Sequence, residues 1–287
     1  MPYPLYSEIN HWYCMFLNKK RCDMNIQVLV ATTDQNKYKL HEKMNIQTST
    51  IIANQGNLEG VKYISFRGQE IIYINSLTRG VGNNRNIALE FSDADICILA
   101  DDDMKFIDGY GEIVAYIFKE NPKIDVIIFN LIEKETSRYV NKKTIKIHKL
   151  NYGKYGSARI AFRRKPIQNF NIRFNQNFGG GAKYSAGEDS IFLNDCLNNK
   201  LKILAVPYAI AEIDQNSQST WFVGYNEKFF KDRGALFCKL NARVSRLMAI
   251  RYAFLKHKKY KKTQIKRRQA LKWMFQGIRD FNDDVQC

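Results

Sequence analysis

This chain has no long apolar run: no stretch reaches the 18 residues that mark a transmembrane helix, so none is expected. Its six cysteines are far apart and form no CxxC pair, which argues against a disulfide framework and favours reduced thiols in a cytosolic protein. The first 23 residues contain no continuous apolar core, so a signal peptide is not expected either. Internal repeats and low-complexity segments are also absent from the sequence.

Acidic residues are scarce relative to basic ones. The chain of 287 residues carries 45 Lys and Arg against 28 Asp and Glu, a net charge of +17. Its hydrophobic share of 45% is that of a globular protein, which excludes wholesale disorder. The basic excess indicates an anionic partner, which could be a nucleic acid, an anionic membrane surface or a phosphorylated substrate.

Most of the positive charge is concentrated near the C-terminus. Between Arg243 and Arg279 there are thirteen Lys or Arg and no Asp or Glu, which leaves +4 for the rest of the chain. Bulky apolar residues are interleaved at near-helical spacing, among them Trp273 and Phe275. Such a basic amphipathic tail favours attachment to an anionic membrane surface. The alternatives are a solvated helical tail that packs its apolar side on the body and, less favoured, nucleic-acid binding.

The first half of the chain has the rhythm of alternating strands and helices. Continuous apolar runs begin about every 25 residues, and they predict strands at Asn25–Ala31, Ser49–Ala53, Glu70–Ile74, Asp95–Ala100 and Ile124–Phe129. Helices are predicted between them at Asn36–Met44, Asn83–Phe91 and Gly111–Asn121. Runs without alternation indicate strands covered on both faces, hence a mainly parallel α/β sheet. Ligands of such sheets bind at the carboxyl ends of the strands.

The second half is less regular. Strands are predicted at Ser157–Arg163 and Lys202–Pro207, and the basic, polar stretch Thr136–Lys149 is expected to form a hairpin or excursion. A glycine-rich loop, Phe178–Gly187, leads into a predicted helix at Glu188–Asn198.

Three consecutive carboxylates, Asp101, Asp102 and Asp103, follow the apolar run ICILA. Adjacent carboxylates repel one another, and the end of a buried strand increases that repulsion. A divalent cation between them makes the arrangement favourable, and hard oxygen ligands suit Mg²⁺ or Mn²⁺. We therefore expect a metal and phosphate site here. The alternative is a solvated acidic turn.

Two glycine-containing segments are also candidate site elements. The segment TRGVGNNRN, Thr78–Asn86, precedes an apolar helical run, so its backbone and Arg85 could bind a phosphate, although a turn with a surface arginine explains it equally well. Glu188 and Asp189 open the helix that follows FGGGAKYSAG. Acids in a first helical turn are explained by the helix dipole, and a carboxylate there could instead act as a general base.

Taken together, these motifs resemble a family 2 glycosyltransferase of the GT-A fold, of the kind that makes bacterial polysaccharides. The resemblance covers about Asn25 to Leu240 and rests on the order of ATTDQN, GVGNNRN, ICILADDD and GED along the chain. It implies a Rossmann-like sheet with helices on both faces. The expected organisation is an extension at 1–23, a GT-A domain at 24–240 and a basic helical tail at 241–287. Within the domain, residues 24–135 would bind the nucleotide-sugar and 136–240 the acceptor.

The resemblance also implies a reaction, namely inverting, metal-dependent hexosyl transfer from a nucleotide-diphospho-sugar, with a UDP-sugar as the expected donor. Asp101 and Asp103 would hold Mn²⁺ or Mg²⁺ at the diphosphate, Asp189 would take the proton of the acceptor hydroxyl, and Glu188 would support it. The nucleotide-sugar would also be contacted by Thr32, Thr33, Asp34, Asn54, Arg85, Asp101 and Asp102. The acceptor would be a glycan or lipid-linked saccharide at the inner face of the cell membrane.

Trp221 follows the last predicted strand and could stack on a sugar, although core packing explains it slightly better. Two other functions compete with sugar transfer. A sugar-phosphate nucleotidyltransferase shares the parallel sheet and metal carboxylates, but it needs a glycine-rich basic loop at the first strand, and ATTDQNKYK has no glycine. A nucleic-acid-binding protein using the basic tail would leave the acidic triplet without a purpose.

Overall fold

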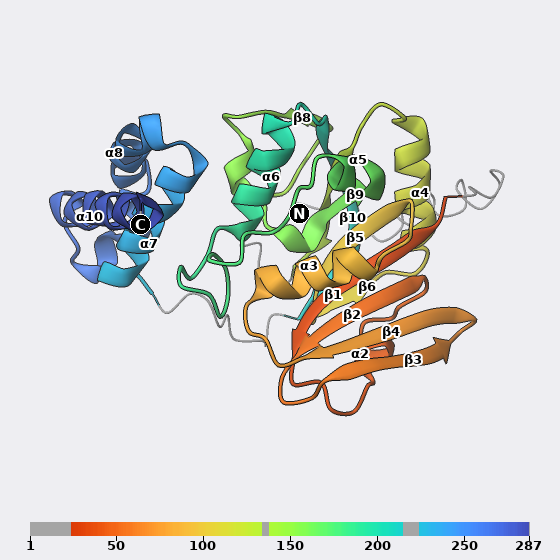
Figure 1. Cartoon of the computed structure of the whole chain (residues 1–287). Coiled ribbons are helices and arrows are strands. Elements are labelled where there is room, and N and C mark those ends of the chain that lie inside the picture. Colours follow the sequence, from red (N-terminus) through yellow and green to blue (C-terminus); the bar gives the residue numbers. More distant parts are fainter. Residues whose placement is uncertain (1–23, 134–137, 215–223, 287) are drawn as a thin grey trace. The chain divides into compact units, whose positions relative to one another are not determined.

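The computed structural model describes residues 24–133, 138–214 and 224–286, and it divides them into two compact units (Figure 1). Of the described residues, unit 1 contains 24–78, 84–133, 138–173 and 195–214, and unit 2 contains 79–83, 174–194 and 224–286. The division falls within helix α3 (Val81–Phe91) and helix α6 (Glu188–Asn198). The predicted extension at 1–23 and Trp221 lie outside the described residues.

In the described residues, unit 1 is built on a ten-stranded sheet. Its strand order is β3-β4-β2-β1-β5-β9-β7-β10-β6, and β8 also pairs with β10. The strands are β1 (Ile26–Thr33), β2 (Ser49–Gln55), β3 (Gly60–Phe66), β4 (Gln69–Ser76), β5 (Ile96–Asp101), β6 (Met104–Phe106), β7 (Val126–Ile132), β8 (Ile145–Ile147), β9 (Ile160–Arg163) and β10 (Ile203–Ile213). All five strands predicted in the first half are therefore present, with ends shifted by at most three residues.

The sheet is mixed rather than uniformly parallel. Strands β4, β2, β1 and β5 are mutually parallel, as predicted, and β7 pairs with β10 in parallel. Strand β9 is antiparallel to both of its neighbours, β5 and β7, and the edge strands β3, β6 and β8 are also antiparallel. The mainly parallel prediction is thus correct for the half that begins the chain and needs correction beyond β5.

The central strands are covered on both faces, which explains their uninterrupted apolar runs. Val28 and Val30 point into a core shared with α4 (Tyr110–Glu120), whereas Leu29, between them, is also only 1% exposed. Burial of such side chains is the main favourable contribution to folding. The remaining unit 1 helices are short: α2 (Leu40–Lys43) and α5 (Arg164–Asn169), with 3-10 turns at Tyr152–Lys154 and Ser157–Arg159.

Two sequence predictions need correction in unit 1. The helix expected at Asn36–Met44 is reduced to α2, because Tyr38 has a backbone φ of +49°, which no right-handed helix accommodates. The strand expected at Ser157–Arg163 begins only at Ile160, after a 3-10 turn. Strands β3 and β6 were not predicted. Strand β3 is an edge strand with mostly exposed residues, so it lacks a continuous apolar run.

Unit 2 contains the C-terminal helices: α7 (Glu227–Leu240), α8 (Ser245–Leu255), α9 (His257–Tyr260) and α10 (Arg267–Gln286), with 3-10 turns at Ala242–Val244 and Lys261–Thr263. Figure 1 shows them in blue, with α7, α8 and α10 packed together. Their shared core is apolar and includes Phe230, Ala249, Tyr260, Met274 and Ile278. The tail is therefore helical, as predicted, and the apolar side of α10 packs on its own unit.

Helices α7 and α10 approach each other through glycines. A β-carbon on Gly234 would lie 2.1 Å from the carbonyl oxygen of Met274, and one on Gly277 would lie 2.0 Å from that of Lys231. No side chain fits at such distances, so the two backbones are in direct contact at these positions. The close crossing lets Phe230 and Met274 become fully buried between the helices.

Candidate active site

Polar side chains gather where β1, β2, β4 and β5 end. In the sheet register Thr32 is opposite Asn54, Asn54 is opposite Asn75, and Ala31 is opposite Asp101. Because these strands are parallel, all four ends meet at one edge of unit 1, which we call the carboxyl edge. The sequence places candidate nucleotide-binding residues on three of these four strand ends.

The acidic triplet lies at this edge and is held by specific partners. Thr32 Oγ1 donates a hydrogen bond to Asp102 Oδ2 at 2.5 Å, and Arg85 Nη2 is 2.7 Å from Asp101 Oδ1. The backbone oxygen of Asp103 accepts a hydrogen bond from the amide of Asp214 at 2.8 Å. All three aspartates are partly exposed, so the triplet is a supported but solvent-accessible cluster.

Arg85 stabilises the triplet from a buried position next to Asp101. Its side chain is 4% exposed, whereas that of Asp101 is 39% exposed, so the arginine is buried behind an accessible carboxylate. A buried guanidinium needs such a partner, and its charge offsets the repulsion among the three aspartates. Helix α3 fixes this position, because the preceding residue, Asn84, donates from Nδ2 to the carbonyl of Thr32 at 2.9 Å.

Asn54 is a buried crosslink at the carboxyl edge. Its Oδ1 accepts a hydrogen bond from the amide of Gln35 at 2.9 Å, and its Nδ2 donates to Asn75 Oδ1 at 2.8 Å. The side chain therefore ties the loop after β1 to the end of β4. Thr33, the last residue of β1, and Asp34, the first residue of that loop, are exposed, and Asp34 adopts the left-handed conformation with φ +54°. Hydrogen bonds thus fix the base of the loop, and its first residue is accessible to solvent.

Glu188 and Asp189 belong to unit 2, where they form the first turn of α6. Glu188 is 9% exposed and its Oε2 accepts a hydrogen bond from the amide of Gly187 at 3.1 Å. Asp189 is half-buried, and its Oδ1 accepts from the amide of Ser190 at 2.5 Å. Both amides lie at the start of α6, where backbone N–H groups lack partners within the helix. Both acids therefore cap the helix, as the helix-dipole explanation predicts.

The glycine-rich loop before α6 is closely packed. Gly179, with φ +109°, leaves no room for a β-carbon, which would lie 2.6 Å from Val81 Cγ1 and 2.9 Å from Glu188 Oε2. The amide of Val81 donates to the carbonyl of Gly180 at 3.0 Å. The loop therefore packs closely against Glu188.

The predicted unit 1 residues Thr32, Asn54, Arg85, Asp101 and Asp102 are thus connected at one edge. Sequence reasoning missed the groups that bond to them, which are the side chains of Asn75 and Asn84 and the backbone of Gln35. One signal was available, because the apolar runs STIIAN and EIIYIN both end in asparagine. Two strands that end alike in a parallel sheet place like groups side by side.

The donor set of the edge suits a hard divalent cation, since Asp101 and Asp103 offer carboxylate oxygens beside solvent. Within the described residues no group of three or more His, Cys, Asp or Glu side chains is arranged as a complete metal site. Mg²⁺ commonly takes only one or two protein carboxylates and completes its shell with substrate phosphates and water. The residues present fit that mode of binding.

Three solved structures of S. aureus TarS are similar to this chain, each with 16% sequence identity. The complex of TarS 1–349 with UDP covers 89% of this chain and 81% of that one, with a TM-score of 0.59. The complex of TarS 1–349 with UDP-GlcNAc covers 80% and 73%, with a TM-score of 0.57. A further TarS structure covers 81% of this chain and 44% of that one, with a TM-score of 0.56.

These similarities show that the chain has the GT-A fold expected from the sequence. No model of a known protein family and no curated protein sequence matches the chain. In the described residues, none of the helices is both long and apolar enough to cross a membrane.

Proposed function

We propose that this protein transfers a sugar from a nucleotide-diphospho-sugar, and specifically a UDP-sugar, to a glycan or lipid-linked saccharide. The observation that carries the proposal is the supported acidic triplet at the carboxyl edge of a GT-A fold. Two of the similar structures contain UDP or UDP-GlcNAc, which favours a uridine nucleotide as the donor. The linkage would be formed with inversion at the anomeric carbon, in the synthesis of a surface polysaccharide.

Asp101 and Asp103 are the residues that we assign to Mn²⁺ or Mg²⁺. When bound, the cation would stabilise the negative charge that develops on the diphosphate leaving group. Arg85 would hold Asp101 in place, since its guanidinium is buried against that carboxylate. Thr32 would orient Asp102 in the same way through its 2.5 Å hydrogen bond. Thr33, Asp34 and Asn54 would shape the nucleotide pocket, because they end β1 and β2 at the same edge.

Asp189 is the residue that we assign as the general base. It would take the proton of the acceptor hydroxyl as that oxygen attacks the anomeric carbon and the bond to the diphosphate breaks. Its carboxylate is half-buried at the start of α6 and accepts a hydrogen bond from the Ser190 amide, which fixes its position. Glu188, packed against Gly179, would support the loop before Asp189. If the acceptor is lipid-linked, the reaction takes place at the cytoplasmic face of a membrane.

The test is a ligand panel followed by a donor-turnover assay. We expect UDP and UDP-sugars to raise the melting temperature more in the presence of Mn²⁺ than in its absence, and Asp101→Asn to abolish that difference. Asp93→Asn is the matched control, because Asp93 is an exposed acid of the same unit, and it should behave as the wild type. Stabilisation by nucleoside triphosphates and sugar phosphates alone would favour nucleotidyl transfer instead. No response to any nucleotide would reject the proposal.

A further inference from the structure

Helix α8 exposes an unusual amount of apolar surface. Of the thirteen large hydrophobic side chains that are exposed in the described residues, five lie within twelve consecutive positions: Val244, Leu247, Ile250, Phe254 and Leu255. Leu247 is 65% exposed and Leu255 is 64% exposed. Single exposed hydrophobics are ordinary, but a contiguous group of this kind marks an interaction surface.

The exposed group lies on one face of the helix. Leu247, Ile250 and Phe254 follow the i, i+3, i+7 spacing that aligns side chains along a helical face. Ala249 and Ala253, on the opposite side, are fully buried in the core of unit 2. Helix α8 therefore has two apolar faces, one of which packs on its own unit and the other of which faces solvent. We call the second one the α8 face.

The α8 face is bordered by positive charge. Arg246 and Arg251 are exposed on the same helix, and Arg267 of α10 places its guanidinium 5.3 Å from the ring centroid of Phe254. The sequence from 243 to 279 contains no Asp or Glu. Nothing in this segment counters the attraction of these cations to an anionic surface.

We infer that the α8 face is a docking surface for an anionic lipid bilayer. Apolar side chains surrounded by arginines match the interface of such a bilayer, where alkyl groups enter the acyl boundary and guanidinium groups remain at the phosphates. A nucleic acid has no apolar layer to receive Leu247 and Leu255. A second copy of the chain would bring the same cations together, which is unfavourable.

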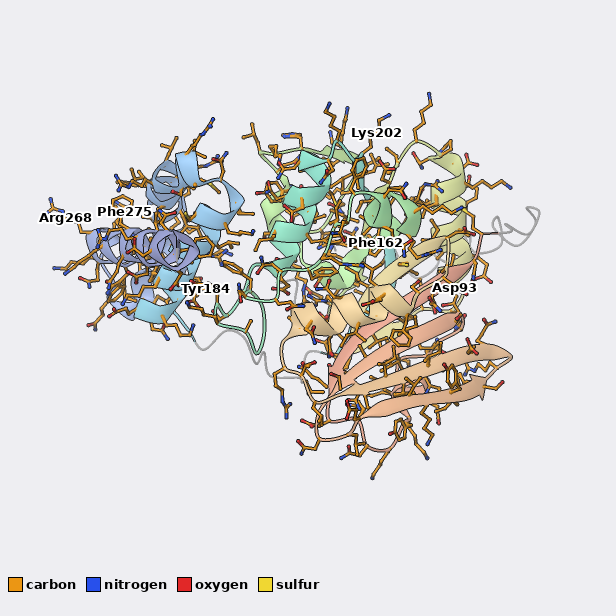
Figure 2. All side chains as sticks on the ribbon, viewed as in Figure 1. Asp93, Phe162, Tyr184, Lys202, Arg268 and Phe275 are labelled. Carbon is orange, nitrogen blue, oxygen red and sulfur yellow. The ribbon has the colours of Figure 1, made fainter. Side chains whose placement is uncertain are left out.

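This inference changes which residues bind the membrane. The sequence pattern indicated the whole basic tail and singled out Trp273 and Phe275, but Trp273 packs beside Phe230 and Met274 is fully buried in the core of unit 2. Trp273 and Met274 are therefore packed within unit 2. Leu271 and Phe275 of α10 (Figure 2) remain half-exposed, and the α8 face is the more exposed apolar surface of the two helices. The inference concerns membrane binding alone and holds whichever sugar, if any, the protein transfers.

The experiment is co-sedimentation of the full chain with lipid vesicles. Vesicles of phosphatidylcholine with about one third phosphatidylglycerol should bind the chain, and pure phosphatidylcholine should bind it weakly. The double variant Leu247→Ser with Phe254→Ser should bind at least about tenfold more weakly, because two apolar anchors are lost. Arg246→Gln with Arg251→Gln should bind about tenfold more weakly and should show a smaller dependence on salt.

Leu150→Ser is the matched control, since Leu150 is 80% exposed but belongs to unit 1, and it should bind as the wild type does. Each variant should keep the melting temperature of the wild type, because all substituted side chains are exposed. Unchanged vesicle binding by the leucine and phenylalanine double variant would overturn the inference. So would a wild-type chain that binds neutral and anionic vesicles equally, or competition by RNA for the same residues. A fall in molecular mass caused by that double variant would show a self-association surface instead.

Discussion

Charge is handled in opposite ways at the carboxyl edge and on the α8 face. At the carboxyl edge, a buried arginine is matched to Asp101, and the side chains of Thr32 and Asn54 make defined hydrogen bonds. On the α8 face, arginines are exposed among exposed hydrophobics, and no carboxylate occurs in the surrounding sequence. The first arrangement is preorganised, because burial and hydrogen bonds fix its side chains. The second is open, and its charges gain a counterpart only when a partner arrives.

The contrast indicates a division of labour between the two regions. A preorganised set of polar groups is what catalysis and ligand positioning require, since it needs little reorganisation during reaction. An exposed set of like charges attracts large anionic surfaces at longer range, and salt screens it. The net charge of +17 alone would suggest that the whole surface is basic. Thirteen positive charges, however, lie between residues 243 and 279.

The largest expected effect tests whether catalysis depends on carboxylates that lie outside the basic segment 243–279. Asp189→Asn should lower the rate of transfer by about 10²–10⁴-fold, because it removes the proposed base, and donor binding should stay nearly normal. The measurement is single-turnover transfer to a saturating acceptor. Asp195→Asn, six residues further along α6, is the control and should stay within a few-fold of wild type. A rate that survives Asp189→Asn would remove this residue from the mechanism.

A smaller effect tests whether the helical tail is part of a folded unit rather than an appendage. Gly277→Ala should lower the free energy of unfolding by about 1–3 kcal/mol, since the new methyl group meets the Lys231 carbonyl across the helix crossing. The result opposes the helix propensity of alanine, which alone would stabilise by about 1 kcal/mol. Chemical denaturation measures it. Gly153→Ala, where a β-carbon meets nothing within 4 Å, should be nearly neutral. An equally neutral Gly277→Ala would mean that the helices separate easily.

The smallest effect concerns pH. His41 of α2 is buried, and burial lowers its pKa below the usual value, opposed in part by the nearby Glu42. The unfolded chain therefore takes up a proton at a pH where the folded chain does not, so stability should fall as the pH drops below about 6.5. Melting curves at about pH 7 and pH 5 should differ less for His41→Gln. Vesicle binding should not depend on the titration of Lys or Arg between about pH 5 and pH 7, because both side chains stay protonated there.

The sequence predicted the elements of unit 1 better than their directions. An apolar run such as ICILA identifies a buried strand, but it carries no information on whether its neighbour is parallel, so the antiparallel β9 beside it was not foreseen. The triplet and GVGNNRN were placed at one site because they follow adjacent β-α units. That Arg85 points at Asp101, and not outward to a phosphate, depends on the packing of α3, which no local pattern encodes.

The basic tail also shows what a local sequence pattern cannot predict, namely which apolar face of a helix the fold will bury. Its helical spacing was readable, yet apolar residues occur on two faces of α8, and the sequence does not say which face the fold will cover. Only the glycine crossing of α7 and α10 settles this for α10, because it buries Met274. Backbone contacts between residues about 40 positions apart decide that outcome, whereas periodicity is a local signal.

Strand β9 has a consequence for how the chain is made. In the described sheet, β5 and β7 do not pair with each other; the four residues Ile160–Arg163 lie between them and join the two halves. During synthesis, the strands up to β5 can associate as soon as they leave the ribosome, but the second half cannot be joined until residue 163 has emerged. Such late, long-range closure is slow compared with local contacts. The nascent chain therefore holds an uncovered edge at β5 for the time that some sixty further residues take to translate, about 3–12 s at typical rates of synthesis.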